Sequence, residues 1–149
     1  MSRDTLLTNC HVVRGARRIE LRRGRTSLAA TILAGDPRTD RCLLRTTGAG
    51  LTPVPGLRDM GSLAVGERVY TIGNPSGLEA TFGEGIISGL RHAGGIRLIQ
   101  TTAPASPGSS GGGLFDARGN LLGITTFLIR APGDTDTFRF AIAAEEYWR

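Results

Sequence analysis

The sequence predicts an all-β domain, either a barrel or a sandwich. Glycine accounts for 22 of the 149 residues, aromatic residues make up only 5%, and Gly and Pro separate many short apolar runs. This punctuation favours short strands joined by turns over long helices. We expect helical turns only after His11 and at the C-terminus. The length and the 40% hydrophobic content are sufficient for one compact domain with its own core.

The first half of the chain contains three expected strands. Residues 17–23 alternate polar and apolar side chains, and residues 26–34 can form their antiparallel partner across Gly24 and Arg25. Residues 41–46 give another short apolar run. The Pro- and Gly-rich stretch that follows, 48–67, suits a connection between subdomains. We therefore divide the domain, 1–149, into parts 1–55 and 56–149.

The second half continues the strand pattern. Residues 69–73 form one expected strand, and 81–90 with 96–103 form a pair. A glycine-rich elbow at 108–113 precedes a hairpin over 113–129, whose turn runs from Asp116 to Asn120. A last strand covers 138–144.

The charge pattern leaves several kinds of partner open. The net charge is +5, and all 18 basic residues are arginine. Six of them lie close together with only Glu20 to offset them: Arg14, Arg17, Arg18, Arg22, Arg23 and Arg25. Such a surface can attract polyanions or acidic peptides, although a solvated strand edge is the simpler interpretation. With few aromatic residues for base stacking, a basic barrel that binds nucleic acid is a minor alternative.

No run approaches the roughly 18 apolar residues of a membrane span. The start lacks the succession of charged, apolar and small residues that is typical of a secretory signal.

Histidine is the scarcest residue with acid–base chemistry. The chain has only His11 and His92. His92 lies in RHAGG, which is typical of an exposed hairpin tip, whereas His11 ends the apolar run LLTNCHVV, where a ring can be held rigidly. His11 is therefore the better candidate for a catalytic base.

Two further residues complete a candidate catalytic group. Ser110 lies in PASPGSSGGGLFD, where glycines allow backbone amides to converge beside an exposed hydroxyl, although a flexible glycine-serine turn has the same composition. Asp40 opens an apolar strand and can lie beside a histidine, although an aspartate at this position is commonly a turn former. The chain order His11, Asp40, Ser110 matches one known order of the Ser-His-Asp triad.

Several longer motifs resemble one protein family. The segments TNCHVV, DPRTDRCLL, VYTIGNPSG, EGIISGL, LIQTTAPASPGSSGGGLFDARGNLLGITT and FAIAA are similar, in this order, to signatures of the bacterial HtrA (Deg) branch of trypsin-like serine proteases. The resemblance covers nearly the whole chain. It implies two six-stranded-type antiparallel β-barrels with the active site between them. The family has another strand before the first motif, so we expect the N-terminal barrel to lack its first strand, or to receive it from another segment.

The same resemblance assigns residues to a site. Ser110 would be the nucleophile of a serine endopeptidase, His11 the general base and Asp40 its orienting carboxylate. Gly108 and Ser110 would form the oxyanion hole, with Ser109 setting the turn between them. The primary specificity pocket would be built from Pro104, Ala105, Ser106, Thr126, Phe127 and Leu128. Because none of these is a carboxylate, we expect cleavage of protein or peptide substrates after small or medium aliphatic residues. A catalytically impaired peptide-binding module on the same fold is the alternative.

The remaining expectations concern cofactors, compartment and cysteines. We expect no cofactor and no metal, because two cysteines do not make a metal site. The resemblance favours the bacterial periplasm or cell envelope and leaves a homo-oligomer open. Contact between His11 and Asp40 would bring Cys10 and Cys42 into one neighbourhood. Sequence does not set their geometry, so a disulfide and two buried thiols both stay open.

Overall fold

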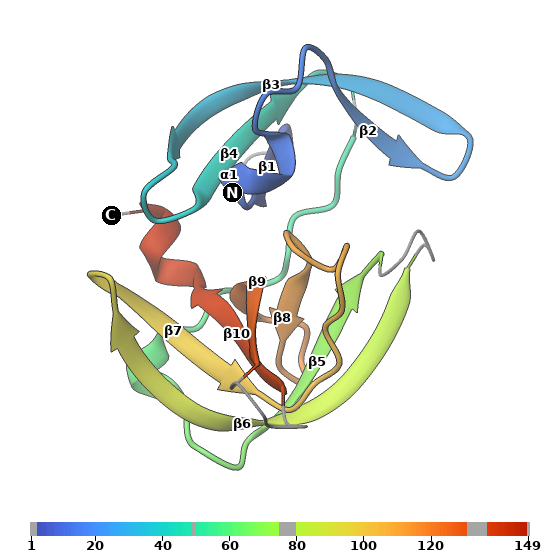
Figure 1. Cartoon of the computed structure of the whole chain (residues 1–149). Coiled ribbons are helices and arrows are strands. Elements are labelled where there is room, and N and C mark those ends of the chain that lie inside the picture. Colours follow the sequence, from blue (N-terminus) through green and yellow to red (C-terminus); the bar gives the residue numbers. More distant parts are fainter. Residues whose placement is uncertain (1–2, 49, 75–79, 131–136, 149) are drawn as a thin grey trace.

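The computed structural model describes residues 3–48, 50–74, 80–130 and 137–148, without the side chains of 127–130, and confirms a nearly all-β chain. Figure 1 shows an open sheet above a closed barrel. The open sheet has the order β1-β4-β3-β2. Its strands are β1 (Thr5–Thr8), β2 (Ile19–Arg23), β3 (Thr26–Asp36) and β4 (Arg41–Thr46), and the short helix α1 (Cys10–Val13) follows β1.

The closed barrel has the order β10-β7-β6-β5-β8-β9. Its strands are β5 (Arg68–Gly73), β6 (Thr81–Ala93), β7 (Ile96–Thr101), β8 (Gly113–Phe115), β9 (Leu121–Arg130) and β10 (Thr137–Ala143), and the 3-10 helices η1 (Met60–Ser62) and η3 (Ala144–Trp148) flank it. All pairings are antiparallel. The double β architecture predicted from the sequence is confirmed. Among the described helices, none is long and apolar enough to cross a membrane.

The β2–β3 hairpin follows from the alternation in the sequence. Leu21 pairs with Leu28 and Arg23 with Thr26, which leaves Gly24 and Arg25 as the turn. Ile19 and Leu21 pack against a core cluster of the open sheet, and Glu20 between them is exposed. Within the described residues the sheet has four strands and does not close, in agreement with the expected incomplete first barrel.

Apolar packing joins the two parts. The interior of the closed barrel contains fully buried Ile87, Ile99 and Leu122. A second cluster, which includes buried Tyr147, receives Leu7 and Leu43 from the open sheet. The open sheet and the closed barrel therefore share one apolar contact region, which fixes how residues from the two parts face each other.

The C-terminal helix η3 adds polar contacts across the same region (Figure 1). The Tyr147 hydroxyl donates to the Thr8 carbonyl at 3.3 Å. The Arg41 guanidinium donates to the Glu146 carbonyl and pairs with its carboxylate at 3.7 Å. Arg97 Nη1 donates to Glu146 Oε1 at 2.8 Å. Burial, followed by the nearby negative charge of Asp40, raises the pKa of Tyr147 above its usual range, so its hydroxyl stays a donor.

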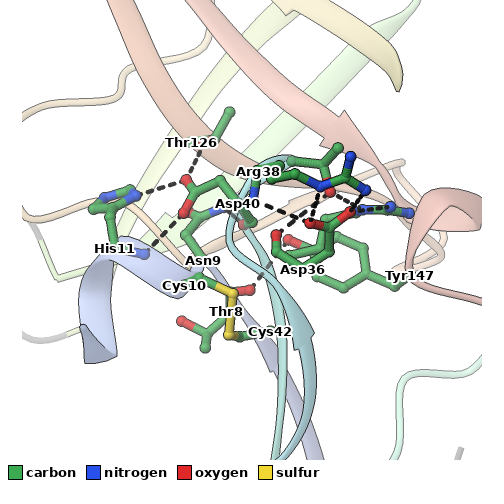
Figure 2. Close-up of a disulfide and its surroundings, with 12 residues drawn as sticks. Thr8, Asn9, Cys10, His11, Asp36, Arg38, Asp40, Cys42, Thr126 and Tyr147 are labelled. Atoms are coloured by element: carbon green, nitrogen blue, oxygen red, sulfur yellow. Dashed lines mark hydrogen bonds and ion pairs between the residues drawn. A yellow bond between two sulfur atoms is a disulfide. The ribbon is translucent and has the colours of Figure 1, made fainter. Parts of the chain in front are cut away.

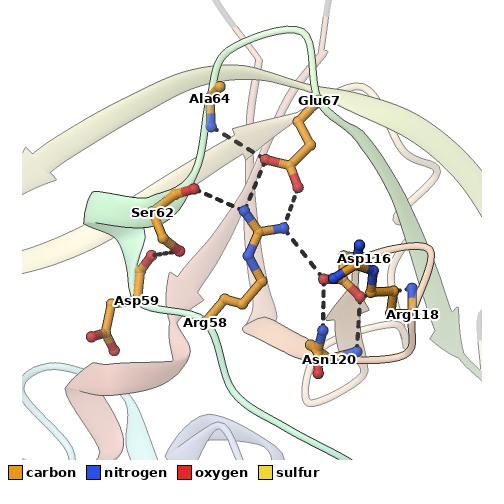
Figure 3. Close-up of polar contacts among 8 residues, drawn as sticks. All are labelled: Arg58, Asp59, Ser62, Ala64, Glu67, Asp116, Arg118 and Asn120. Atoms are coloured by element: carbon orange, nitrogen blue, oxygen red, sulfur yellow. Dashed lines mark hydrogen bonds and ion pairs between the residues drawn. The ribbon is translucent and has the colours of Figure 1, made fainter.

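A polar cluster holds the connection between the two parts against the closed barrel (Figure 3). Arg58 contacts the Glu67 carboxylate, and its Nη1 lies 3.3 Å from Asp116 Oδ2. Asp116 also accepts hydrogen bonds of 2.9 Å from the backbone amides of Arg118 and Asn120, which form the expected turn. Burial raises the pKa of Asp116, but the hydrogen bonds from Asn120, Arg118 and Arg58 outweigh it and hold that pKa below its ordinary value.

The connection itself joins the closed barrel at a defined point. The Leu121 amide donates to the Gly56 carbonyl at 2.9 Å, and the Arg58 amide donates to the Leu121 carbonyl at 3.1 Å. These bonds are consistent with our division of the chain after residue 55, which stays a proposal.

Candidate active site

Helix α1 and the turn before β4 bring two of the sequence-predicted residues together. His11 Nδ1 lies 2.6 Å from Asp40 Oδ2, and the His11 backbone amide donates to Asp40 Oδ1 at 2.8 Å (Figure 2). Both carboxylate oxygens therefore hold the same histidine. Because Nδ1 is engaged, Nε2 is the ring nitrogen available for proton transfer, and the His11 side chain is 44% exposed.

The backbone at Asp40 is unusual for a residue with a side chain. Its φ is +58°, in the left-handed region that favours glycine. The Cys10 amide and the Asn9 side-chain amide both donate to the Asp40 carbonyl, at 3.3 and 3.2 Å. These two bonds hold the carbonyl in place and, with it, direct the Asp40 carboxylate toward His11. Such backbone conformations gather at functional sites.

A β-bulge in β9 places Thr126 at the centre of the site. Phe140 pairs with Phe127 and Ala141 pairs with Thr125, so Thr126 has no partner in the β9–β10 register. Its Oγ1 donates to Asp40 Oδ2 at 3.0 Å, and its carbonyl accepts a hydrogen bond from Ser110 Oγ at 2.9 Å. Bulges commonly turn a residue out of the ladder beside active sites. Thr126 thus links Ser110 to Asp40.

Ser110 lies within this group without contacting the histidine. Its half-buried hydroxyl donates to Thr126, and among the contacts of the described residues there is no hydrogen bond between Ser110 and His11. Catalytic hydrogen bonds often form only when substrate binds, so this arrangement is compatible with a triad.

The elbow before β8 is a tight, glycine-dependent turn. Gly108 and Gly111 have φ of +95° and +88°, which requires glycine at both positions. Ser109 holds the turn, since its amide donates to the Ser106 carbonyl at 2.8 Å and its Oγ accepts from the Ser106 amide at 3.2 Å. Within the described part of the chain, the amides of Gly108 and Ser110 have no hydrogen-bond acceptor.

A small hollow lies beside Ser110. It has a volume of about 20 Å³ and is lined by the predicted residues Ala105, Ser106 and Thr126, together with Phe140, which the sequence reasoning missed. Pro104 lines an adjacent hollow of about 30 Å³, and its carbonyl accepts from Thr71 Oγ1 at 2.9 Å. The expected pocket residues Phe127 and Leu128 lie in β9, but their side chains are outside the described residues.

The described lining of this hollow carries no acidic side chain. Arg139 Nε lies 3.3 Å from the Ala105 carbonyl. His92 is at the exposed end of the β6–β7 hairpin, opposite Arg97, and is not part of this group.

The arginine-rich segment borders a larger groove. The groove measures about 670 Å³, and Arg18, Arg22 and Arg23 line it together with the elbow residues Gly108 and Ser110. An extended chain that reaches Ser110 would therefore pass along a basic surface.

Comparisons with known proteins find related sequences. The family of the trypsin-like peptidase domain matches residues 1–124. A Pseudomonas putida protein named "Probable periplasmic serine endoprotease DegP-like" is 38% identical over 142 residues, 92% of this chain and 30% of that protein. "Protease Do-like 1, chloroplastic" from Arabidopsis thaliana is 36% identical over 151 residues, 94% of this chain and 34% of that protein. The chain thus spans about a third of the length of these curated relatives.

A solved structure extends the likeness to three dimensions. The structure titled "HtrA-type protease AlgW with decapeptide" aligns with a TM-score of 0.88 and 34% identity, over 99% of this chain and 47% of that one. The similarity therefore includes both the open sheet and the closed barrel.

Proposed function

The chain belongs to the trypsin-like peptidase family, in its HtrA branch, and from this premise we propose that it is a serine endopeptidase that cleaves protein or peptide substrates. The observation that carries the proposal is the bidentate hold of Asp40 on His11 beside the two free amides of the Ser110 elbow. That arrangement supplies an oriented base and an oxyanion site within one small region.

The proposed reaction begins when Ser110 Oγ attacks the scissile carbonyl carbon. His11 Nε2 accepts the hydroxyl proton, while Asp40 holds the tautomer with the proton on Nδ1 and stabilises the imidazolium. The amides of Gly108 and Ser110 donate to the oxyanion. Collapse of this intermediate expels the amine, which takes the proton from His11 and leaves an acyl-enzyme on Ser110. Water, deprotonated by His11, then releases the acid and regenerates the hydroxyl.

The small hollow supports the expected specificity. A volume of about 20 Å³ between Ala105, Ser106 and Phe140 holds little more than one water before any adjustment. A small or medium aliphatic side chain is the substituent that such a space accommodates with least rearrangement. Arg139 beside the Ala105 carbonyl adds an electrostatic penalty for arginine or lysine at this position.

The proposed compartment is the periplasm or cell envelope. The Pseudomonas putida relative carries the word periplasmic in its name. The disulfide between Cys10 and Cys42 is a bond that persists in oxidising compartments such as the periplasm.

The proposal is tested by covalent labelling with an alkyl fluorophosphonate. Wild-type protein should be labelled once, on the peptide that contains Ser110, and Ser110→Ala should not be labelled. Ser62→Ala, which changes an exposed serine of η1, is the matched control and should be labelled as fast as wild type. His11→Ala should be labelled far more slowly, because the base is missing.

Three other results would contradict the proposal. Labelling that persists in Ser110→Ala would refute the assignment of the nucleophile. Binding of peptides without turnover or labelling would favour a peptide-binding module. Salt-sensitive retention on a DNA or RNA column without labelling would favour a nucleic-acid-binding barrel.

A further inference from the structure

The two cysteines of the chain form a disulfide around the candidate base. The bond joins Cys10 and Cys42, which settles the alternative that the sequence left open. Cys10 directly precedes His11, and Cys42 lies two residues after Asp40. Figure 2 shows the bond next to the His11–Asp40 pair. The disulfide therefore joins the two segments that carry these side chains.

The ladder between β1 and β4 also joins these segments and ends with Thr8 opposite Cys42, but few hydrogen bonds continue beyond it toward the pair. Helix α1 has only 4 residues, and its N-cap residue makes no side-chain capping bond. The backbone contact between Cys10 and Asp40 is a single bond of 3.3 Å, and the Asn9 side chain adds one of 3.2 Å. A helix this short has little stability of its own. Beyond the end of the β1–β4 ladder, the disulfide is the covalent restraint between α1 and the turn at Asp40.

A glycine on β3, Gly35, leaves room for the disulfide. Both cysteines are buried, at 4% and 3% exposure. Gly35 pairs with Cys42 in the register of β3 and β4. A Cβ at position 35 would lie 2.6 Å from Cys42 Sγ and 3.2 Å from Cys10 Sγ, so a side chain at that position would collide with the bond. The glycine backbone is what lets the disulfide lie against the strand.

We propose that the Cys10–Cys42 disulfide is a positioning element of the active site, which holds His11 and Asp40 at their working distance. The inference rests on the proposed serine-peptidase function. When a dithiol reduces the bond, two electrons and two protons pass to the sulfurs, two thiols form and the dithiol becomes a cyclic disulfide. The segments of the histidine and the carboxylate are then held only by the β1–β4 ladder, apolar packing and the hydrogen bonds at Asp40, and catalytic turnover falls.

The test compares wild type, the double variant Cys10→Ala with Cys42→Ala, and Ile87→Ala. Ile87 is fully buried in the closed barrel, so its truncation lowers stability without touching α1 or β4. All three are assayed with a Val-ending peptide well below their melting temperatures. The cysteine variant should lose about 10- to 100-fold in kcat with KM within about twofold, and Ile87→Ala should keep its kcat. Equal kcat in wild type and the cysteine variant, or an equal loss in Ile87→Ala, would overturn the inference.

Reduction of the wild-type protein provides the second measurement and does not depend on folding of the variant. Alkylation and mass analysis should show no free thiol before dithiol treatment and two after it. Activity of wild type should fall as thiols form, whereas the cysteine variant should not respond, because the chain has no other cysteine. Undiminished wild-type activity with two alkylated thiols would contradict the inference.

A readout without substrate separates this inference from the proposed function. The Nδ1 proton between His11 and Asp40 should give a low-field proton resonance, which should broaden or disappear after reduction. Absence of labelling and turnover in oxidised wild type would refute the peptidase function alone. An Nδ1 resonance unchanged by reduction would refute the positioning role whatever the activity.

Discussion

Asp40→Asn is the substitution that probes the hold on His11 most sharply. The carboxylate accepts three hydrogen bonds: from the His11 amide at 2.8 Å, from His11 Nδ1 at 2.6 Å and from Thr126 Oγ1 at 3.0 Å. A side-chain amide keeps one acceptor oxygen and gains an NH2 donor. If the oxygen stays on the His11 backbone amide, the NH2 faces Nδ1, which must then be unprotonated.

The expected loss of activity follows from the tautomer that the side-chain amide of Asp40→Asn would force on the His11 ring. With the proton on Nε2, His11 cannot accept the Ser110 proton. The opposite amide orientation places NH2 against the His11 backbone N–H, which leaves donors without acceptors at a cost of about 1–3 kcal/mol. In Ser-His-Asp triads the same change lowers kcat by about 10,000-fold, which is about 5.5 kcal/mol of transition-state stabilisation. We expect a loss of this size here.

The assay measures kcat/KM with a Val-ending peptide and the rate of fluorophosphonate labelling. Asp36→Asn is the matched control, because Asp36 lies four residues earlier and pairs with Arg38 and Arg41 instead of His11. The control should stay within about tenfold of wild type, and circular dichroism should confirm that both variants fold. Asp40→Asn with activity within tenfold of wild type would refute the proposed role of the carboxylate.

Three further predictions concern specificity and stability. Phe140→Ala enlarges the hollow beside Ser110. The ratio of kcat/KM for a Leu-ending peptide to kcat/KM for an Ala-ending peptide should rise about tenfold, and an unchanged ratio would exclude Phe140 from the specificity pocket. Arg58→Met removes the ion-pair partner of Glu67 and Asp116. Because the cluster is only partly buried, the free energy of unfolding from urea titrations should fall by about 2 kcal/mol, and a fall of less than about 0.5 kcal/mol would contradict a stabilising role for Arg58. The pKa of Asp116 is lowered in the folded state, so its stabilising contribution is complete above its unfolded pKa of about 3.9 and is lost as pH falls through the folded value. The melting temperature of Asp116→Asn should therefore be below that of wild type at pH 7 and converge with it below about pH 4. A difference in melting temperature that persists at acid pH would argue against ionisation of Asp116 as the cause.

Local patterns were sufficient to predict most strands. The alternation in the segment RRIELRR predicted β2, and the two-residue connection to β3 followed from Gly24 and Arg25. The Asp116 turn was likewise predicted, because Asp and Asn side chains satisfy their own backbone amides. β1 was not predicted as a strand, because its pairing with β4 is a long-range contact that the four residues TLLT do not specify.

The site depended on information that spacing alone does not contain. His11 was selected because histidine is scarce and this one ends an apolar run, and Asp40 because it opens a strand and fits the chain order of the triad, but only the fold brings them to 2.6 Å. Phe140 was missed because it lies at a β-bulge, and sequence does not reveal where the register of β9 and β10 shifts. The Ser110–Thr126 hydrogen bond was missed for the same reason.

The most direct test is a crystal structure of the protein after reaction with a peptidyl fluorophosphonate that carries valine next to the phosphorus. We predict phosphorus bonded to Ser110 Oγ, the phosphonyl oxygen about 2.7–3.1 Å from both the Gly108 and Ser110 amides, and His11 still paired with Asp40. An adduct on another residue, or a phosphonyl oxygen directed away from those two amides, would contradict the proposed active site.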